Sequence, residues 1–352
     1  MAEAEQSPPS SAPRLAIVIV NYRTATLAIA CVASLAAERA RVGPFDVIVV
    51  DGGSGDGSAQ ALQAHFAGSD WVSVLPLDFN GGFGWANNQA MLRLLQRDEP
   101  PDYIHLLNPD TVVEPGAIAA LLDVIAAHPE LGAVGSQLLE PDGRLAGSAF
   151  RFPSAGREFV RGAGLGGLGA KLGIAPATVE RSAPGPAEWL TGASVMFRSA
   201  ALRQIGLFDD GFFLYFEEVE LMGRLARAGW AMWTVPASRI VHIAGAATGV
   251  ASGGDVAVRP HPAYRYEARR RYFVRASGVG GLVAANLAWL AGKVVGAPIR
   301  ALRGKGDAGP PREFAMTIRH CFWPSRRDLR AAIPRWDEPP GRMPAWSVKD
   351  AG

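Results

Sequence analysis

The chain has 352 residues, of which 49% are hydrophobic and 19% are charged, and its net charge is +2. This ordinary composition excludes a disordered or fibrous chain and predicts a globular protein, with one large domain or one domain and an appended piece. The charge gives no sign of a nucleic-acid partner, and none is expected. The two cysteines, Cys31 and Cys321, lie too far apart in sequence to suggest a disulfide framework, which favours a reducing compartment.

The first 13 residues are small, polar and acidic, and no basic stretch precedes an apolar core. We therefore expect residues 1–13 to form a disordered tail and not a signal peptide.

Strands and helices alternate through the first 130 residues. Apolar runs typical of strands buried on both faces occupy residues 15–20, 45–50, 71–77 and 103–107. Helical patterns follow them at residues 24–38, 58–66, 85–96 and 116–127. Four such units with short connections predict an α/β fold with a mostly parallel, Rossmann-like sheet flanked by helices.

Polar side chains follow three of these strands, namely Asn21, Asp51 and Asp110. Because open α/β sheets bind ligands at the carboxyl ends of their strands, we expect the three to line one edge together. Asp51 can accept a hydrogen bond from a nucleotide, or it can simply stabilise the glycine-rich turn that follows. Asp110 can bind Mg²⁺ or Mn²⁺, or it can belong to an Asn-Pro-Asp turn without a ligand.

The second half of the chain has a weaker pattern. Strands are expected at residues 133–139, 189–197, 230–235 and 240–242. Residues 151–187 are rich in glycine and proline and predict a long loop. Residues 162–167 formally match the dinucleotide-binding fingerprint, but no convincing strand precedes them, so a flexible loop is expected there. Little structure is expected after Gly309. His242, which follows a β-branched pair, can be a second metal ligand or a structural histidine, and His105 inside a strand is expected to be structural.

Three acids, Glu217, Glu218 and Glu220, open a predicted helix at residues 217–228. Acids in a first turn favour the helix dipole without any catalytic role. Glu220 also has Arg224 four residues on, in the order that favours an ion pair. A carboxylate at the mouth of a nucleotide cleft can alternatively act as a general base.

Basic residues flank an apolar stretch at residues 279–299, which is long enough to span a membrane but contains Lys293 and several glycines. We expect an interfacial helical segment at residues 265–305 that makes peripheral membrane contact; the alternative is a helical subdomain packed on the rest of the protein. The basic residues expected to face anionic lipid are Arg269, Arg270, Arg271, Arg275, Arg300, Arg303 and Lys305.

Six motifs, in this order, resemble those of family 2 glycosyltransferases, and specifically the rhamnosyltransferase-like members that build bacterial surface polysaccharides. They occupy residues 17–22, 49–58, 80–88, 106–111, 189–193 and 215–221. The resemblance implies a GT-A fold and a metal-dependent, inverting hexosyltransferase. The expected organisation is a catalytic domain at 14–262, with a nucleotide-sugar half at 14–130 and an acceptor half at 131–262. A basic helical extension at 263–308 and a proline-rich segment at 309–352 would follow.

The resemblance also implies binding residues for a dTDP- or UDP-sugar donor. By position, Asn21, Arg23 and Asp51 match the nucleoside pocket of the family, and Asn80 and Asn88 match its second donor loop.

Asn108 and Asp110 match the DxD motif with the first acid replaced by asparagine, which leaves Asp110 as the charged ligand for Mg²⁺ or Mn²⁺. His242 matches an additional metal ligand that some members use. Glu218 stands where the family usually has its aspartate base, with Glu217 beside it, so the longer side chain departs from the pattern.

The expected reaction is transfer of a sugar, with L-rhamnose as first candidate, to a hydroxyl of a glycan or a polyprenyl-diphosphate-linked acceptor. We expect a cytoplasmic protein, at the cytoplasmic face of the membrane if the extension contacts lipid. Two alternatives are a sugar-nucleotide nucleotidyltransferase and an inactive nucleotide-sugar-binding relative. The former predicts a glycine-rich loop after the first strand, whereas residues 21–24 contain no glycine.

Overall fold

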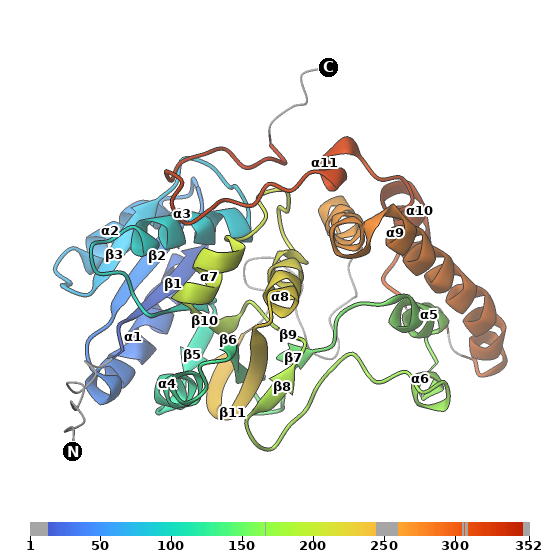
Figure 1. Cartoon of the computed structure of the whole chain (residues 1–352), viewed down its shortest axis with the longest axis horizontal. Coiled ribbons are helices and arrows are strands. Elements are labelled where there is room, and N and C mark those ends of the chain that lie inside the picture. Colours follow the sequence, from blue (N-terminus) through green and yellow to red (C-terminus); the bar gives the residue numbers. More distant parts are fainter. Residues whose placement is uncertain (1–12, 166, 244–259, 305, 307–308, 348–352) are drawn as a thin grey trace, which may run out of the picture.

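The structure, a computed structural model, describes residues 13–165, 167–243, 260–304, 306 and 309–347 (Figure 1). Almost all of the expected disordered tail, and Lys305, lie outside these ranges. The described part contains a central nine-stranded sheet with the order β3-β2-β1-β4-β10-β6-β11-β5, and β8 pairs with β11. Helices cover both faces, so the predicted α/β fold class is confirmed.

The amino-terminal half supplies the parallel part of the sheet. Its strands are β1 (Leu15–Asn21), β2 (Asp46–Asp51), β3 (Val72–Pro76) and β4 (Tyr103–Leu107). Its helices are α1 (Ala25–Val42), α2 (Ser58–Phe66), α3 (Phe83–Leu95) and α4 (Ala117–Ala127). Alternate residues of β1 enter different cores: Ile17 packs with α1, α2 and α4, whereas Val18 packs with α3. Burial on both faces explains the uninterrupted apolar run of this strand.

The second half extends the sheet with antiparallel and parallel neighbours. Its strands are β5 (Thr111–Val113), β6 (Leu131–Leu139), β8 (Gly185–Ala187), β10 (Ser194–Arg198) and β11 (Ala231–His242). Strand β10 runs antiparallel to both β4 and β6. Two helices, α7 (Ser199–Ile205) and α8 (Glu217–Arg227), cover the same face as α3.

Two strand predictions need correction. The expected strand at 189–197 is broken at residues 191–193, so that β9 (Trp189–Leu190) pairs with β7 (Ala149–Phe150) in a separate small sheet. The expected strands at 230–235 and 240–242 are one strand, β11, with an irregular pairing register between Val235 and Arg239.

The prediction of a long loop at 151–187 is wrong. This segment forms α5 (Ala155–Ala163) and α6 (Leu168–Lys171), and the side chain of Ser154 caps α5 by accepting a hydrogen bond from the backbone of Arg157. A Cβ atom added to Gly162 of α5 would lie 2.2 Å from the carbonyl oxygen of Trp289. The small residue therefore permits close contact between two helices and does not mark a loop.

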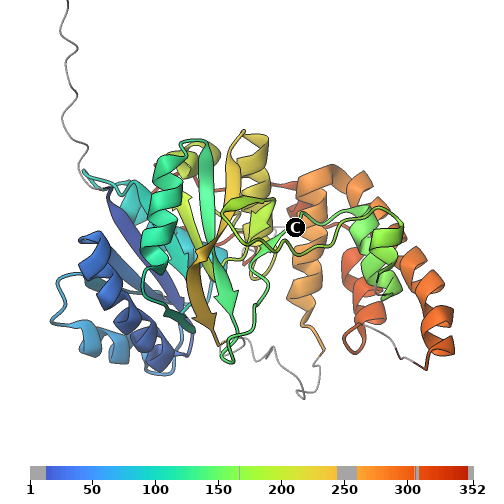
Figure 2. The ribbon, with the colours of Figure 1, turned by 90° about the horizontal axis from the view of Figure 1, so that it is seen from below.

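The carboxyl-terminal part also contains more helix than predicted. Helix α9 (Ala263–Leu302) is kinked at Gly278, where φ is 70°, and is followed by α10 (Glu313–Cys321) and α11 (Arg326–Leu329). Helices α5, α6, α9 and α10 lie together beside the sheet (Figures 1 and 2). The chain then returns to the part that contains the sheet, where the indole Nε1 of Trp346 donates to the carbonyl oxygen of Gly81 at 3.0 Å.

Most of the basic residues expected to face lipid instead form contacts inside the protein, because each meets a carboxylate or a carbonyl group. The ion pairs are Arg269 with Glu158, Arg270 with Asp328, and Arg271 and Arg275 with Asp209. Arg300 is buried and donates to the carbonyl oxygen of Ala163. Among the described residues, α9 is the one helix long and apolar enough to cross a membrane. Of its apolar 18-residue stretch, 39% is buried in the protein.

Candidate active site

A cavity of about 570 Å³ opens at the carboxyl ends of β1, β2 and β4 and the end of β11, and we call it the sheet-edge cavity. Six of the predicted site residues line it: Asn80, Asn108, Asp110, Glu217, Glu218 and His242. They come from parts of the chain more than 150 residues apart, which the crossovers of the sheet bring to one edge.

Asn21, Arg23 and Asp51 do not line this cavity, although their chain neighbours Tyr22 and Gly52 do. The Asp51 carboxylate accepts hydrogen bonds from the backbone and hydroxyl of Ser54, at 3.0 and 2.7 Å, and from the Asn21 amide at 2.8 Å. Arg23 donates its Nε to the carbonyl oxygen of Ser54 at 3.0 Å. The three residues thus fix the two loops whose members Tyr22 and Gly52 reach the cavity.

The glycine-rich loop after β3 approaches another loop very closely. Gly82 has φ of 89°, and a Cβ atom there would lie 1.9 Å from the carbonyl oxygen of Phe213. The side chain of Asn80 accepts from the Gly82 backbone at 3.0 Å, and Phe83 donates its backbone N–H to Phe213 at 3.2 Å. Glycine is therefore required to bring this loop against the segment that precedes α8.

Asn88, predicted to contact a donor, has a different role in the structure. It is fully buried, and its Nδ2 donates to the carbonyl oxygen of Phe208 and to the Asp210 carboxylate at 2.9 and 2.8 Å. Its Oδ1 accepts from the backbone of Phe208 at 3.0 Å. Because these bonds engage both polar atoms of its amide, Asn88 positions the loop after α7.

Asp110 and His242 lie side by side where the β4–β5 connection meets the end of β11. The Asp110 carboxylate is 3.2 Å from His242 Nε2, and the Asn108 amide is 3.4 Å from the same nitrogen. Within the described ranges there is no cluster of three or more histidine, cysteine or acidic residues that could hold a metal ion. The pair fits a divalent cation that takes its other ligands from substrate phosphates, as Mg²⁺ usually does.

His105 is structural, as predicted. Its ring is fully buried and its Nε2 lies 3.0 Å from the Ser194 hydroxyl. Burial lowers the pKa of His105 to about 3, so the ring is neutral at physiological pH.

Glu217 and Glu218 begin α8 after two bulky residues with left-handed backbone, Tyr215 (φ 74°) and Phe216 (φ 67°). Such strained conformations cluster at functional sites. Burial, and then the neighbouring carboxylate of Glu218, raises the pKa of Glu217 well above its ordinary value. Burial also raises the pKa of Glu218, and the Arg265 guanidinium partly offsets this effect.

Glu220 forms the ion pair predicted from its spacing. Both oxygens of its buried carboxylate accept from Arg224 Nε, at 2.9 and 3.1 Å, and the Arg224 side chain is 10% exposed. By contrast, Oε2 of Glu217 and Oε2 of Glu218 have no hydrogen-bond partner in the described part of the protein. Glu220 is therefore occupied structurally, whereas the first two acids keep free oxygens beside the cavity.

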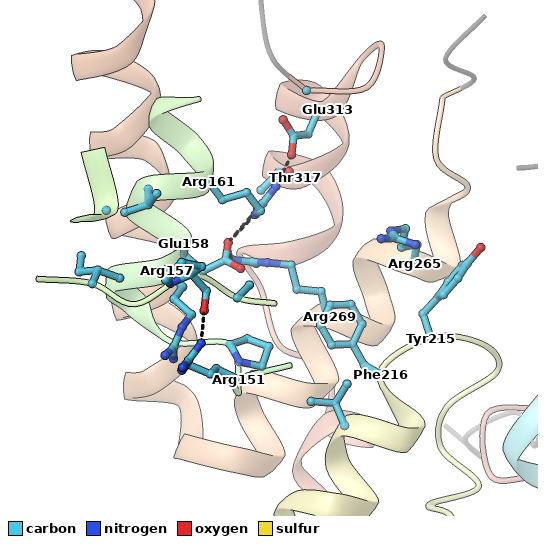
Figure 3. A pocket seen from close by; sticks show the side chains of 18 of the residues that line it. Arg151, Arg157, Glu158, Arg161, Tyr215, Phe216, Arg265, Arg269, Glu313 and Thr317 are labelled. Carbon is cyan, nitrogen blue, oxygen red and sulfur yellow. Dashed lines mark hydrogen bonds and ion pairs between the residues drawn. The ribbon is translucent and has the colours of Figure 1, made fainter. Parts of the chain in front are cut away.

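A second cavity, of about 840 Å³, lies between α5, α6, α9 and α10, and we call it the helical cavity (Figure 3). Tyr215, Glu218 and Arg265 line both cavities, so the two spaces meet at these side chains. Arg265 stands at the start of the helical segment expected at residues 265–305, and no role at a cavity was predicted for it. Its position beside the acidic helix α8 depends on tertiary packing and could not be predicted from the sequence.

The comparisons with known proteins agree with this geometry. Residues 16–157 match the family model described as "Glycosyl transferase family 2". A curated relative from Mycobacterium tuberculosis strain H37Rv, "N-acetylglucosaminyl-diphospho-decaprenol L-rhamnosyltransferase", is 34% identical over 249 residues, which is 67% of this chain and 78% of the relative.

Two solved structures share the fold. One is S. aureus TarS 1-349 in complex with UDP-GlcNAc, with a TM-score of 0.53, 13% identity, and coverage of 87% of this chain and 79% of that chain. The other is the mannosyltransferase PcManGT from Pyrobaculum calidifontis in complex with GDP-Man and Mn²⁺, with a TM-score of 0.50, 15% identity, and coverage of 88% and 80%. The sheet, the polar cavity at its edge and these relationships together establish that the chain belongs to glycosyl transferase family 2 and is a glycosyltransferase with a GT-A fold.

Proposed function

We propose that the protein transfers a hexosyl residue from a dTDP- or UDP-sugar to a hydroxyl of a polyprenyl-diphosphate-linked glycan in cell-surface polysaccharide synthesis, with inversion at the anomeric carbon. L-Rhamnose is the first candidate because the M. tuberculosis relative is named as an L-rhamnosyltransferase. The observation that carries the proposal is the sheet-edge cavity, which is lined by the Asp110–His242 pair and by Glu217 and Glu218. Each of these glutamates has one oxygen without a hydrogen-bond partner in the described part of the protein.

Asp110 and His242 are the residues that would hold Mg²⁺ or Mn²⁺, with the Asn108 amide beside them. When bound, the ion would neutralise charge on the diphosphate leaving group. The Mn²⁺ in the mannosyltransferase structure supports a divalent ion in this fold. Asn80 and Gly82 line the same cavity, where the donor's sugar and phosphates would be oriented.

Glu218 is proposed as the base, because it is the carboxylate that lines both cavities. The acceptor hydroxyl would give its proton to the free Oε2 of Glu218 as its oxygen attacks the anomeric carbon. A single direct displacement of this kind needs one base and no covalent nucleophile. Glu217 lines the sheet-edge cavity but not the helical cavity. Burial and the neighbouring Glu218 carboxylate raise the pKa of Glu217, so Glu217 would stay protonated beside an ionised Glu218.

We propose that the protein contacts the cytoplasmic membrane surface through an apolar face of α9 and α10. The basic residues of α9 that were expected to face lipid would not make this contact. Val283, Leu287 and Val294 of α9 are 45%, 55% and 68% exposed and share one side of the helix by their spacing. On α10, Phe314 and Ile318 are exposed beside residues that line the helical cavity. A lipid-linked acceptor would be presented from such a surface.

A donor panel tests the function. The protein is incubated with Mg²⁺ and dTDP-, UDP- or GDP-sugars, with and without a lipid-diphosphate glycan acceptor, and nucleoside diphosphate release is measured. Release that requires one donor and the acceptor, and that falls in Asp110→Ala, is expected. Formation of pyrophosphate from a nucleoside triphosphate and a sugar phosphate would identify a nucleotidyltransferase, and binding without turnover would identify an inactive relative.

A further inference from the structure

We propose that the helical cavity is the acceptor subsite and that Arg151 and Arg157 bind the diphosphate that joins the acceptor sugar to its polyprenyl chain. This inference rests on the proposed function and deepens it, because it names the part of the acceptor that the enzyme recognises. The first reason is position: the cavity meets the sheet-edge cavity at Glu218, so a sugar hydroxyl at Glu218 would have the rest of its molecule in the helical cavity.

The second reason is charge. Five arginines and three glutamates line the helical cavity: Arg151, Arg157, Arg161, Arg265, Arg269, Glu158, Glu218 and Glu313. Arg161 is engaged by Glu158 and Glu313, and Arg269 is engaged by Glu158. Figure 3 shows Arg161 between the two carboxylates. Arg161 and Arg269 are therefore engaged by carboxylates of the protein, and these ion pairs hold the helices together.

Arg151 and Arg157 differ from Arg161 and Arg269, because in the described ranges they form no ion pair with a carboxylate. Arg151 Nη1 donates to the carbonyl oxygens of Pro176 and Thr178, at 2.9 and 3.2 Å. Arg157 donates to those of Phe152 and Ala175, at 2.9 and 3.4 Å. No carboxylate offsets the positive charge of either guanidinium, and each has at least one nitrogen whose N–H groups these bonds do not use. A diphosphate would bind to such a charged group with free N–H donors.

The third reason is that apolar groups share the cavity with these cations. Its walls include Val160, Leu165, Ile174, Trp189, Phe216 and Val219. Figure 3 places Arg151 and Arg157 on the side of the cavity away from Arg265 and Tyr215. A lipid-linked acceptor would fill this space in the order of its own parts. Its sugar would lie at Glu218, its diphosphate at Arg151 and Arg157, and its first isoprene units on the apolar walls.

The test compares two acceptors that share a sugar. One is farnesyl-diphosphoryl N-acetylglucosamine and the other is decyl N-acetylglucosaminide, which has a lipid but no phosphate; both are presented in non-ionic detergent with one donor. The variant is Arg151→Gln with Arg157→Gln, because glutamine keeps an amide donor for the backbone carbonyls but removes the charge. Arg181→Gln is the matched control, since Arg181 also donates its Nε to a backbone carbonyl, that of Pro186, and does not line the cavity.

We expect the wild-type enzyme to prefer the diphosphate acceptor in kcat/KM, and the double variant to lose about tenfold or more of that preference through KM. Inorganic pyrophosphate should compete with the acceptor in the wild-type enzyme and in Arg181→Gln, and much more weakly in the double variant. An unchanged preference in the double variant, or transfer to both acceptors with no preference in the wild type, overturns this inference alone. Failure to transfer sugar to either acceptor overturns the proposed function and the inference with it.

Discussion

Replacing Glu218 with glutamine removes the proposed base with little change in shape. The side chain has one carboxylate oxygen without a hydrogen-bond partner in the described part of the protein, so replacing that oxygen with an amide breaks no hydrogen bond there. Loss of a general base typically lowers the rate by about 100- to 10,000-fold, or about 3–5 kcal/mol in the activation barrier. We therefore expect kcat of Glu218→Gln to fall by that factor, while calorimetry shows donor affinity nearly unchanged.

The pH profile gives an independent check on the same residue. The base must be ionised, so kcat should rise with pH through a pKa that burial places above the ordinary range for a glutamate. Arg265 lowers the pKa of Glu218, so Arg265→Gln should move this limb to higher pH. Glu217→Gln and Glu220→Gln should reduce kcat less. Near-wild-type turnover in Glu218→Gln, together with loss of activity in Glu217→Gln, would refute the assignment.

Three further predictions concern stability and membrane contact. Folding raises the pKa of Glu217, so its contribution to stability is present at low pH and is lost as pH rises through the folded-state pKa. Glu217→Gln should therefore raise the Tm at pH 8 more than at pH 4, and an equal change at both would contradict this. Asp209→Ala breaks a buried ion pair with Arg271 and should cost about 3–5 kcal/mol in urea unfolding. The exposed Asp142→Ala should cost much less, and equal costs would argue against this prediction. The wild type should float with liposomes and Leu287→Asp should not, whereas a wild type that stays in the soluble fraction would exclude the apolar contact.

The sheet was predictable because its strands are buried on both faces. The β-branched run that includes Ile17 and Val18 leaves no polar alternation, and β4 was predicted with its exact bounds. The polar residues that follow such strands were therefore placed correctly at one edge. The ion pair of Glu220 with Arg224 was also predictable, since it depends on helical spacing alone.

Helix α9 was expected as a helical segment at residues 265–305, but α5, α6 and α10 beside it were not predictable, because their sequence signals have another cause. Gly162 in α5 permits contact with α9, as Gly292 does from the other side, where an added Cβ would lie 2.1 Å from the carbonyl oxygen of Phe159. Glycine at such contacts gives the same composition as a loop. The arginines of α9 were expected at a lipid surface because their carboxylate partners, such as Glu158 and Asp209, are distant in sequence.

The site could be predicted in part. Asp110 and His242 were named from separate motifs, but the 3.2 Å distance between them depends on the pairing of β5 with β11. Asn88 was assigned to the donor because its position in a motif does not reveal that its amide faces Phe208 and Asp210. The helical cavity had no sequence signal, since its walls come from segments expected to be loop or lipid-facing.

The most direct test of sugar transfer at Glu218 is the mass of the acceptor product. Purified protein, Mg²⁺, dTDP-L-rhamnose and a diphosphate-linked N-acetylglucosamine lipid are incubated, and the lipid is analysed by mass spectrometry. The account predicts an acceptor that gains one deoxyhexose with the wild-type protein and far less of it with Glu218→Gln. An acceptor that is modified equally by both proteins would contradict the account.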